Sequence, residues 1–284
     1  MRNFVMAAVA AVSLPVAAQA TTTNYIGSQS TIKYSTTPTS ASGFGGTARI
    51  TTQVVYDSAT DTYTLRDTGS PTTTSSFGPA NIVSSTTNFT TYRKTSGSTT
   101  ETFRLLDQSP ANTLIVLNYV TYGQWRRSTA SGTTNSVNDT YVVFGTKTPS
   151  ASIPHSGGAA YNTILDGTFV NKNGAYAISG TGSFNADFAT GSISYSSAAS
   201  GTPEAGGAVI NFGTMTGSGS IAYNSAGFSG TGGYNGNGYA LDVNGNFYGP
   251  AYDEIGGTFH LRSTRATGGN GTGAIVGTGA NINN

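Results

Sequence analysis

The chain has 284 residues, no cysteine, and 13 basic against 12 acidic side chains, which give a formal net charge of +1. Charged residues make up only 9% of the sequence, whereas globular domains contain about 25%. This balance argues against an electrostatically driven nucleic-acid binder, and the missing cysteine excludes disulfides and thiolate metal sites. The 16 Tyr and 13 Phe supply core material, and the scarcity of helix formers favours an all-β protein.

The first 20 residues have the pattern of a secretory signal peptide. Arg2 supplies a positive charge, residues 4–16 form a short apolar stretch, and Ala18 and Ala20 are the small residues that a signal peptidase reads. The apolar stretch is too short for a membrane-spanning helix. Thr21 stands where a lipoprotein would need a cysteine. We therefore expect a soluble, secreted or periplasmic chain, with association to the outer surface as a further option.

Residues 21–148 contain strand signals of mixed quality. Five segments rich in Thr, Val, Ile, Tyr and Phe are predicted strands: 49–57, 61–67, 99–107, 112–127 and 138–146. The apolar run 114–117 predicts a strand buried on both faces, and residues 57–61 predict a hairpin turn. The Ser- and Thr-dominated segments 21–46 and 69–91 are expected to be rich in loops.

Glycine content and charge both change near residue 149. Residues 149–284 hold 29 of the 39 glycines. The segment 146–154 contains two prolines and no periodicity, which is typical of a linker. We therefore expect two domains, residues 21–148 and residues 149–284.

The second domain shows more regular strand patterns. Nine candidate strands cover 159–169, 175–188, 192–197, 208–216, 219–223, 228–234, 239–248, 256–262 and 272–276. Asn244-Gly245 is a hairpin-turn signal, but the apolar–polar alternation of 239–248 continues in phase on both sides of it, so one strand is expected there. Many evenly spaced short strands predict an up-and-down barrel of about eight strands. The second face carries Asn, Asp, Ser and Thr rather than the apolar band of an outer-membrane barrel.

Four phrases, in this order, resemble one family. They lie at residues 119–125, 144–149, 185–191 and 245–259. The last phrase looks like the signature of the β-barrel domain of transferrin-binding protein B, in which an aromatic pair precedes Gly-Pro and an acidic residue leads into Gly-Gly-Thr-Phe. The signature residues are Phe247, Tyr248, Gly249, Pro250, Gly256, Gly257 and Phe259.

The resemblance implies an all-β fold with an N-terminal β-rich handle domain, residues 21–148, and an eight-stranded antiparallel barrel, residues 149–284. It implies an exported, non-enzymatic binding protein of a Gram-negative bacterium that captures a host iron-binding protein such as transferrin or lactoferrin, or haem. This chain lacks the lipid-bearing cysteine and has one lobe where the transferrin binders have two. Both differences favour a smaller secreted binder.

Five residues are candidates for binding. Tyr122, Trp125, Arg126 and Arg127 form the most concentrated cluster of residue types that favour binding hot spots. The alternative interpretation is a tryptophan buried between the two domains, with both arginines solvated. His155 follows Pro154 in the linker, where it is a candidate axial ligand if haem is the cofactor. His260 and Met215 are weaker candidates for the same role.

Catalytic motifs are missing from the sequence. There is no nucleophile elbow, phosphate-binding loop or zinc-protease element, and the acidic pair Asp253-Glu254 would point to opposite faces of a strand. We therefore predict no enzyme, no metal site and no certain cofactor. Two functions stay open. One is a module that captures a host protein or an iron or haem ligand, and the other is a structural surface or matrix barrel without a defined small ligand.

Overall fold

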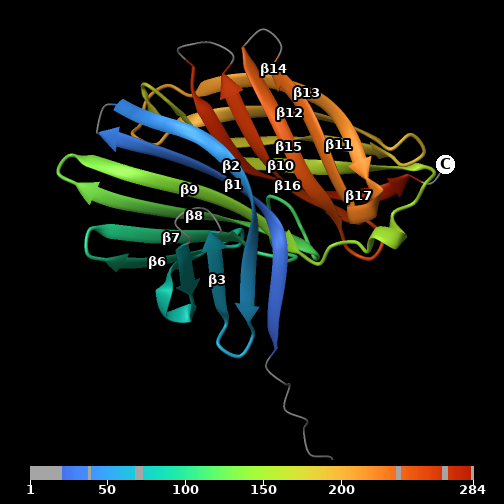
Figure 1. Ribbon diagram of the computed structural model, residues 1–284, viewed down its shortest axis with the longest axis horizontal. Coiled ribbons are helices and arrows are strands. Elements are labelled where there is room, and N and C mark those ends of the chain that lie inside the picture. The colour runs from blue at the N-terminus through green and yellow to red at the C-terminus, as the bar shows by residue number, and fades with distance from the viewer. Residues whose placement is uncertain (1–20, 38–39, 68–72, 235–237, 264–267, 283–284) are drawn as a thin grey trace, which may run out of the picture.

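The computed structural model describes residues 21–37, 40–67, 73–234, 238–263 and 268–282, so the predicted signal peptide lies outside the described residues. Within these residues the chain is all-β, as predicted. It forms one open nine-stranded sheet and one closed eight-stranded barrel. Figure 1 shows the barrel, in yellow to red, above the nine-stranded sheet, in blue to green.

The nine-stranded sheet is built from the first half of the chain, in the spatial order β4-β3-β2-β1-β9-β8-β7-β6-β5. All its pairings are antiparallel. Strand β9 returns to pair with β1, which places the two longest hairpins at the centre. The strands are β1 (Thr22–Thr37), β2 (Ser40–Asp57), β3 (Thr62–Asp67), β4 (Thr73–Phe77), β5 (Ile82–Ser85), β6 (Phe89–Ser96), β7 (Thr99–Leu106), β8 (Val120–Ser131) and β9 (Thr134–Gly145).

The second half of the chain forms the barrel, in which each strand pairs with the next and β17 closes on β10. This confirms the predicted eight-stranded antiparallel up-and-down barrel. Its strands are β10 (Gly158–Asn171), β11 (Gly174–Asp187), β12 (Ser192–Pro203), β13 (Ile210–Ala222), β14 (Gly227–Tyr234), β15 (Tyr239–Tyr248), β16 (Glu254–Ser263) and β17 (Asn270–Ile282). The two candidate strands 208–216 and 219–223 belong to the single strand β13.

Aromatic rings fill the inside of the barrel. The rings of Phe184 and Phe228 lie 4.7 Å apart, and that of Phe247 lies 5.6 Å from Phe228. These side chains are buried because every second residue of a strand points inward. The barrel is therefore a packed core, and its outer wall carries small polar side chains along β12 and β13.

Strand β15 spans residues 239–248, and Asn244-Gly245 lies inside it as predicted. Gly245 faces the interior, where a Cβ atom would lie 2.5 Å from the Phe228 ring and 2.4 Å from the Gly256 carbonyl oxygen. The glycine therefore allows close approach of a neighbouring strand and ring.

Replacing Gly245 with valine is expected to lower the free energy of unfolding by about 1–3 kcal/mol, because extra methyl groups overpack a filled core. Ala240→Val, at an outward position of the same strand, should change it by less than about 0.5 kcal/mol. Urea unfolding of both variants checks this, and equal midpoints would contradict it.

Two expectations for the first half were wrong. The described residues of 21–46 and 69–91 are not dominated by loops, because β1, β4 and β5 lie within these segments and β2 begins at Ser40. Their Ser and Thr side chains are tolerated in strands by cross-strand pairing, and Thr31 shares a 2.9 Å hydroxyl hydrogen bond with Thr140.

The run 114–117 is not a strand. Leu114 is 49% exposed and Val116 is 40% exposed, whereas Ile115 and Leu117 are buried. The side-chain oxygen of Asn112 accepts hydrogen bonds from the amides of Leu114 and Ile115. This local turn competes with sheet pairing.

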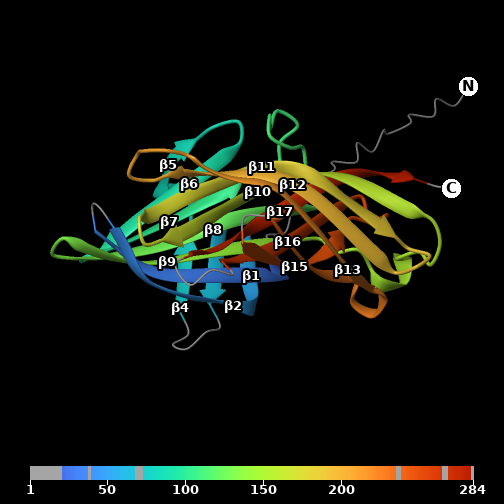
Figure 2. The same ribbon diagram turned by 90° about the horizontal axis from the view of Figure 1, so that it is seen from above.

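The barrel and the nine-stranded sheet lie side by side (Figure 2). Strands β1, β8 and β9 contact β16 and β17, and two apolar clusters form in this interface. Glu254 is 1% exposed at the start of β16. Its carboxylate accepts backbone N–H bonds from Asn118 (2.6 Å), Tyr119 (2.9 Å) and Val120 (2.9 Å), which fixes the chain entering β8 against the barrel.

Candidate functional site

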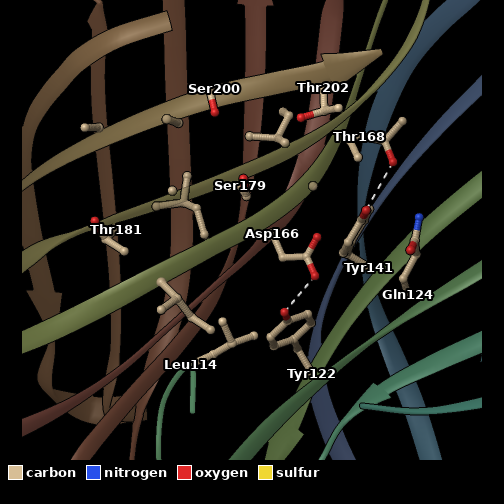
Figure 3. A pocket seen from close by; sticks show the side chains of 18 of the residues that line it. Leu114, Tyr122, Gln124, Tyr141, Asp166, Thr168, Ser179, Thr181, Ser200 and Thr202 are labelled. Atoms are coloured by element: carbon tan, nitrogen blue, oxygen red, sulfur yellow. Dashed lines mark hydrogen bonds between the residues drawn. The ribbon is translucent and has the colours of Figure 1, made fainter. Parts of the chain in front are cut away.

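A cleft of about 1030 Å³ separates the nine-stranded sheet from the outer wall of the barrel. Strands β10 to β13 form one side of this cleft, and β7, β8 and β9 form the other. Figure 3 shows side chains from both sides pointing into it. Its volume lies at the upper end of the range of about 300–1,000 Å³ that is typical of ligand pockets.

On β11, β12 and β13, the barrel side of the cleft carries small side chains. Every second residue of a strand points outward, and the pairing of β11, β12 and β13 aligns these outward residues side by side. The surface that they form is called the wall below. Ser179 pairs with Ser200, and Thr181 pairs with Ala198, which pairs with Thr214. The wall therefore offers hydroxyl groups and methyl groups but no bulky side chain. Its members are Ala177, Ser179, Thr181, Ala198, Ser200, Thr202, Asn211 and Thr214.

The opposite side of the cleft is formed by alternate residues of β8. Tyr122, Gln124 and Arg126 face the barrel and line the cleft, together with Arg104 of β7 and Tyr141 of β9. The period of two in a strand explains this selection. The residues between them face the other side of the sheet and pack in its own core.

Arg104, Asp166 and Tyr122 form an ion-paired group inside the cleft. Arg104 pairs with Asp166, and the Tyr122 hydroxyl donates a 2.7 Å hydrogen bond to the same carboxylate. Figure 3 shows the bond between Tyr122 and Asp166. Burial raises the pKa of Asp166, although the Arg104 charge opposes the shift, and burial raises the pKa of Tyr122 well above its ordinary value. The tyrosine is therefore a neutral donor at neutral pH.

Arg126 bridges the two sheets. It pairs with Asp139 of β9 at 2.6 Å and with Glu204, just after β12, at 2.6 Å. Burial opposes the charge of Arg126, but the carboxylates raise its pKa well above the ordinary value. Thr168 of the barrel donates a 2.6 Å hydrogen bond to Asp139. The guanidinium is thus held between two carboxylates and offers the cleft no uncompensated positive charge.

Two exposed aliphatic side chains flank the cleft. Leu114 lies in the loop before β8 and is 49% exposed, and Val209 lies in the loop between β12 and β13 and is 56% exposed. Both line the cleft. Asn88 accepts a 2.8 Å bond from the Thr113 amide, which holds the loop next to Leu114. These two side chains are referred to below as the apolar lips.

The predicted cluster in β8 is divided between two faces. Tyr122 and Arg126 line the cleft. Trp125 is 2% exposed on the other face, where its indole N–H donates a 3.1 Å bond to Glu101 and Arg127 lies over its ring. His155 is exposed and stacks on Tyr223 with ring centroids 4.5 Å apart, outside the cleft lining. A role of these residues in binding stays a prediction.

The signature residues occupy structural positions in the barrel. Phe247 and Phe259 are buried in the barrel core, and Tyr248 packs in the apolar cluster between barrel and sheet. Gly249 has a φ of +85°, a conformation that L side chains rarely adopt, and it precedes the exposed Pro250. A Cβ at Gly256 would lie 2.6 Å from a methyl carbon of Val120, and one at Gly257 would lie 2.5 Å from the Asn244 carbonyl oxygen.

Several cleft residues were missed by sequence reasoning. Arg104, Asp166, Thr168 and Glu204 are polar residues from three separate segments of the chain, and nothing in the local sequence indicates that these segments meet. Arg104 and Asp166 give a usable signal, because each is a charged residue inside a predicted strand, 99–107 and 159–169.

The donor set of the cleft does not fit haem. The lining contains no His or Met, and the hydroxyls of Tyr122 and Tyr141 are hydrogen-bonded to Asp166 and Thr168. Burial also raises the pKa of both tyrosines well above the ordinary value, which opposes ligation as a phenolate. In the described part of the chain, no three His, Cys, Asp or Glu side chains form a group able to hold a metal ion.

Comparisons with known proteins returned only structural matches. No family model and no curated protein matches the sequence. The solved structures similar to this chain include transferrin-binding protein B of Neisseria meningitidis serogroup B, at 16% identity and a TM-score of 0.48 over 88% of this chain and 43% of that one.

Two further solved structures belong to the same set. A double mutant of transferrin-binding protein B from Haemophilus parasuis Hp5 is 14% identical, with a TM-score of 0.44 over 90% of this chain and 61% of that one. The N-lobe of lactoferrin-binding protein B from Moraxella bovis is 11% identical, with a TM-score of 0.39 over 67% of this chain and 79% of that one. The resemblance expected from the sequence is thus found again among solved structures. The chain spans less than half of the first of these proteins, and the fold assignment rests on its own strand order and barrel closure.

No helix within the described residues has both the length and the apolar character needed to span a membrane.

Proposed function

We propose that this chain is an exported, non-enzymatic binding protein that captures a partner protein in the cleft between the nine-stranded sheet and the barrel. The partner class that the family resemblance implies is a host iron-binding protein. Export rests on the signal-peptide pattern of residues 1–20, and the two domains are residues 21–148 and 149–284.

The single observation that carries the proposal is the cleft itself, with its combination of hydroxyl-bearing wall and apolar lips. Exposed aliphatic side chains next to a concave surface are typical of interaction sites. The titratable groups of the cleft are engaged with one another, since Asp166 is held by Arg104 and Glu204 by Arg126. This arrangement supports binding better than acid–base catalysis.

The second candidate function is a structural surface or matrix protein. The outer wall beyond the cleft favours it, because outward residues of β12, β13 and β14 are almost uniformly Ser and Thr and are exposed. This candidate predicts that no side chain of the cleft affects an interaction of the protein.

A tryptophan that fills the cleft tests the proposal. The purified protein is immobilised and exposed to transferrin and to lactoferrin. Ser200→Trp, within the cleft wall of β12, is expected to weaken binding of a captured protein by roughly tenfold or more, because the indole occupies the contact surface.

Ser194→Trp is the matched control. Ser194 lies on the same strand and the same outward face, is exposed, and is outside the cleft lining. It should leave the affinity unchanged. If both variants capture the partner protein equally well, the binding site lies outside the cleft. If neither transferrin nor lactoferrin binds to the wild-type protein, the structural function is favoured.

A further inference from the structure

The spacing of the barrel wall in the cleft suits an extended chain. Successive outward residues of a strand repeat at about 6.7 Å, twice the rise per residue, and neighbouring strands lie about 4.8 Å apart. Ser179, Thr181, Ser200 and Thr214 are positions of this lattice. An extended polypeptide laid on the wall has the same two-residue repeat, so its alternate side chains find small residues at every repeat.

The hydrogen-bonding groups of the wall are hydroxyls and the Asn211 carboxamide, which both donate and accept. A polypeptide backbone presents N–H and C=O groups in alternation, and a hydroxyl satisfies either one. An anion would need donors in excess, but Arg104 and Arg126 are paired with Asp166, Asp139 and Glu204. A cation would need acceptors in excess, but Asp166 also accepts from Tyr122, Asp139 from Thr168, and both oxygens of Glu204 from Arg126. Because both kinds of charge are engaged within the protein, the cleft favours a ligand without net charge.

The apolar lips add a second requirement. Leu114 and Val209 are 49% and 56% exposed and line the cleft from separate loops. A ligand that covers them must carry apolar groups at intervals along its length. A polypeptide in which aliphatic side chains alternate with neutral polar ones meets this requirement, and it also suits the hydroxyl groups of the wall.

A neutral oligosaccharide is the competing class of ligand. Sugar rings are commonly held on exposed aromatic faces, and the cleft offers none. Tyr122 and Tyr141 are each 1% exposed, and the guanidinium of Arg104 lies 4.3 Å from the centre of the Phe89 ring. The cleft therefore favours the polypeptide.

We infer that the cleft binds an uncharged, extended polypeptide segment in which aliphatic residues alternate with Ser, Thr or Asn. This inference rests on the proposed function, because it names the part of the partner that enters the cleft. The hydroxyls of β11, β12 and β13 bind the backbone of the segment, and the lips contact its aliphatic side chains.

The test uses three probes against the full-length purified protein. The first is a set of N-acetylated, C-amidated peptides in which Val or Leu alternates with Ser, Thr or Asn. The second is the same set with Lys or Glu at the polar positions, and the third is a panel of neutral glucan and mannan oligosaccharides. We expect the first set to bind and the charged peptides to bind roughly tenfold more weakly.

Substitution of the lips locates the bound peptide. The double variant L114N/V209N is expected to bind the neutral peptides about tenfold more weakly. Ile26→Asn removes an equally exposed aliphatic side chain, 61% exposed and outside the cleft lining, and should have no effect. All three positions are exposed, so the variants should unfold at the wild-type urea midpoint.

The outcomes separate this inference from the proposed function. Binding of oligosaccharides but not peptides would overturn the inference. Capture of a partner protein that Ser200→Trp weakens but the neutral peptides do not inhibit would also overturn it. In both cases the cleft would remain the binding site. Loss of peptide binding in Ile26→Asn but not in the lip variant would also overturn the inference.

Discussion

Replacing Glu254 with alanine is expected to lower the free energy of unfolding by about 3–5 kcal/mol. The Glu254 carboxylate is 1% exposed and accepts backbone N–H bonds from Asn118, Tyr119 and Val120. Its removal leaves three amides without their acceptor at the junction of sheet and barrel. Bonds to a charged acceptor are worth about 1.5–3 kcal/mol each, and orphaned buried donors add a desolvation cost.

Asp253 provides the control for this measurement. It is the adjacent acid, is only partly buried, and accepts one 3.2 Å bond from the Ala251 amide. Asp253→Asn should lower the free energy of unfolding by less than about 1 kcal/mol. Urea unfolding followed by circular dichroism measures both variants. Equal losses at the two positions would show that Glu254 does not anchor the segment entering β8.

Replacing Asp139 with alanine should have a similarly large effect, about 3–5 kcal/mol. This carboxylate is 0% exposed and accepts hydrogen bonds from Gln124, Arg126 and Thr168. The substitution leaves the Arg126 charge with a partner on one side only, beneath the cleft. Removing one member of a buried ion pair is costly because the other charge remains desolvated.

Glu204→Ala is the variant to compare with Asp139→Ala, because Glu204 pairs with the same guanidinium of Arg126. Its side chain is 33% exposed, and exposed ion pairs contribute about 0–1 kcal/mol. We therefore expect a loss of less than about 1 kcal/mol for Glu204→Ala in the same urea experiment. Losses of equal size would mean that the burial of Asp139 does not govern the strength of this network.

The barrel could be predicted from the sequence because its signals are local. Alternation of apolar and polar residues in 239–248 places Phe247 inward and Asn246 outward, and the glycines around it permit close packing. The predicted up-and-down topology required only that each strand pairs with the next. Hairpin connectivity is the simplest solution for short strands joined by short turns.

The strands of the nine-stranded sheet could be predicted less well from the sequence. Strand β1 reads as a Ser- and Thr-rich loop, yet it pairs with β2 on one side and with the distant β9 on the other. Its stability comes from these partners, and local composition does not report them. The strand prediction for 114–117 was wrong for the converse reason. Its apolar composition favours a strand, but the Asn112 side chain accepts hydrogen bonds from the amides of Leu114 and Ile115 and holds the segment in a turn.

The cleft shows the limit of sequence reasoning most clearly. The residue types of Tyr122 and Arg126 predict a role in binding, and both side chains line the cleft. Their partners Asp166 and Glu204 lie 44 and 78 residues further along the chain. Only the docking of the barrel on the sheet brings these side chains together, and no local periodicity encodes that docking.

The most direct test of the cleft as the binding site uses the absence of cysteine in the wild-type chain. A single Ser200→Cys variant labelled with an environment-sensitive fluorophore places a reporter in the cleft, and Ser194→Cys places one on the same strand outside it. We predict that saturation with a captured protein or neutral peptide shifts the emission at position 200 to the blue and leaves position 194 unchanged. A shift at position 194 alone, or binding that neither reporter detects, would contradict the account.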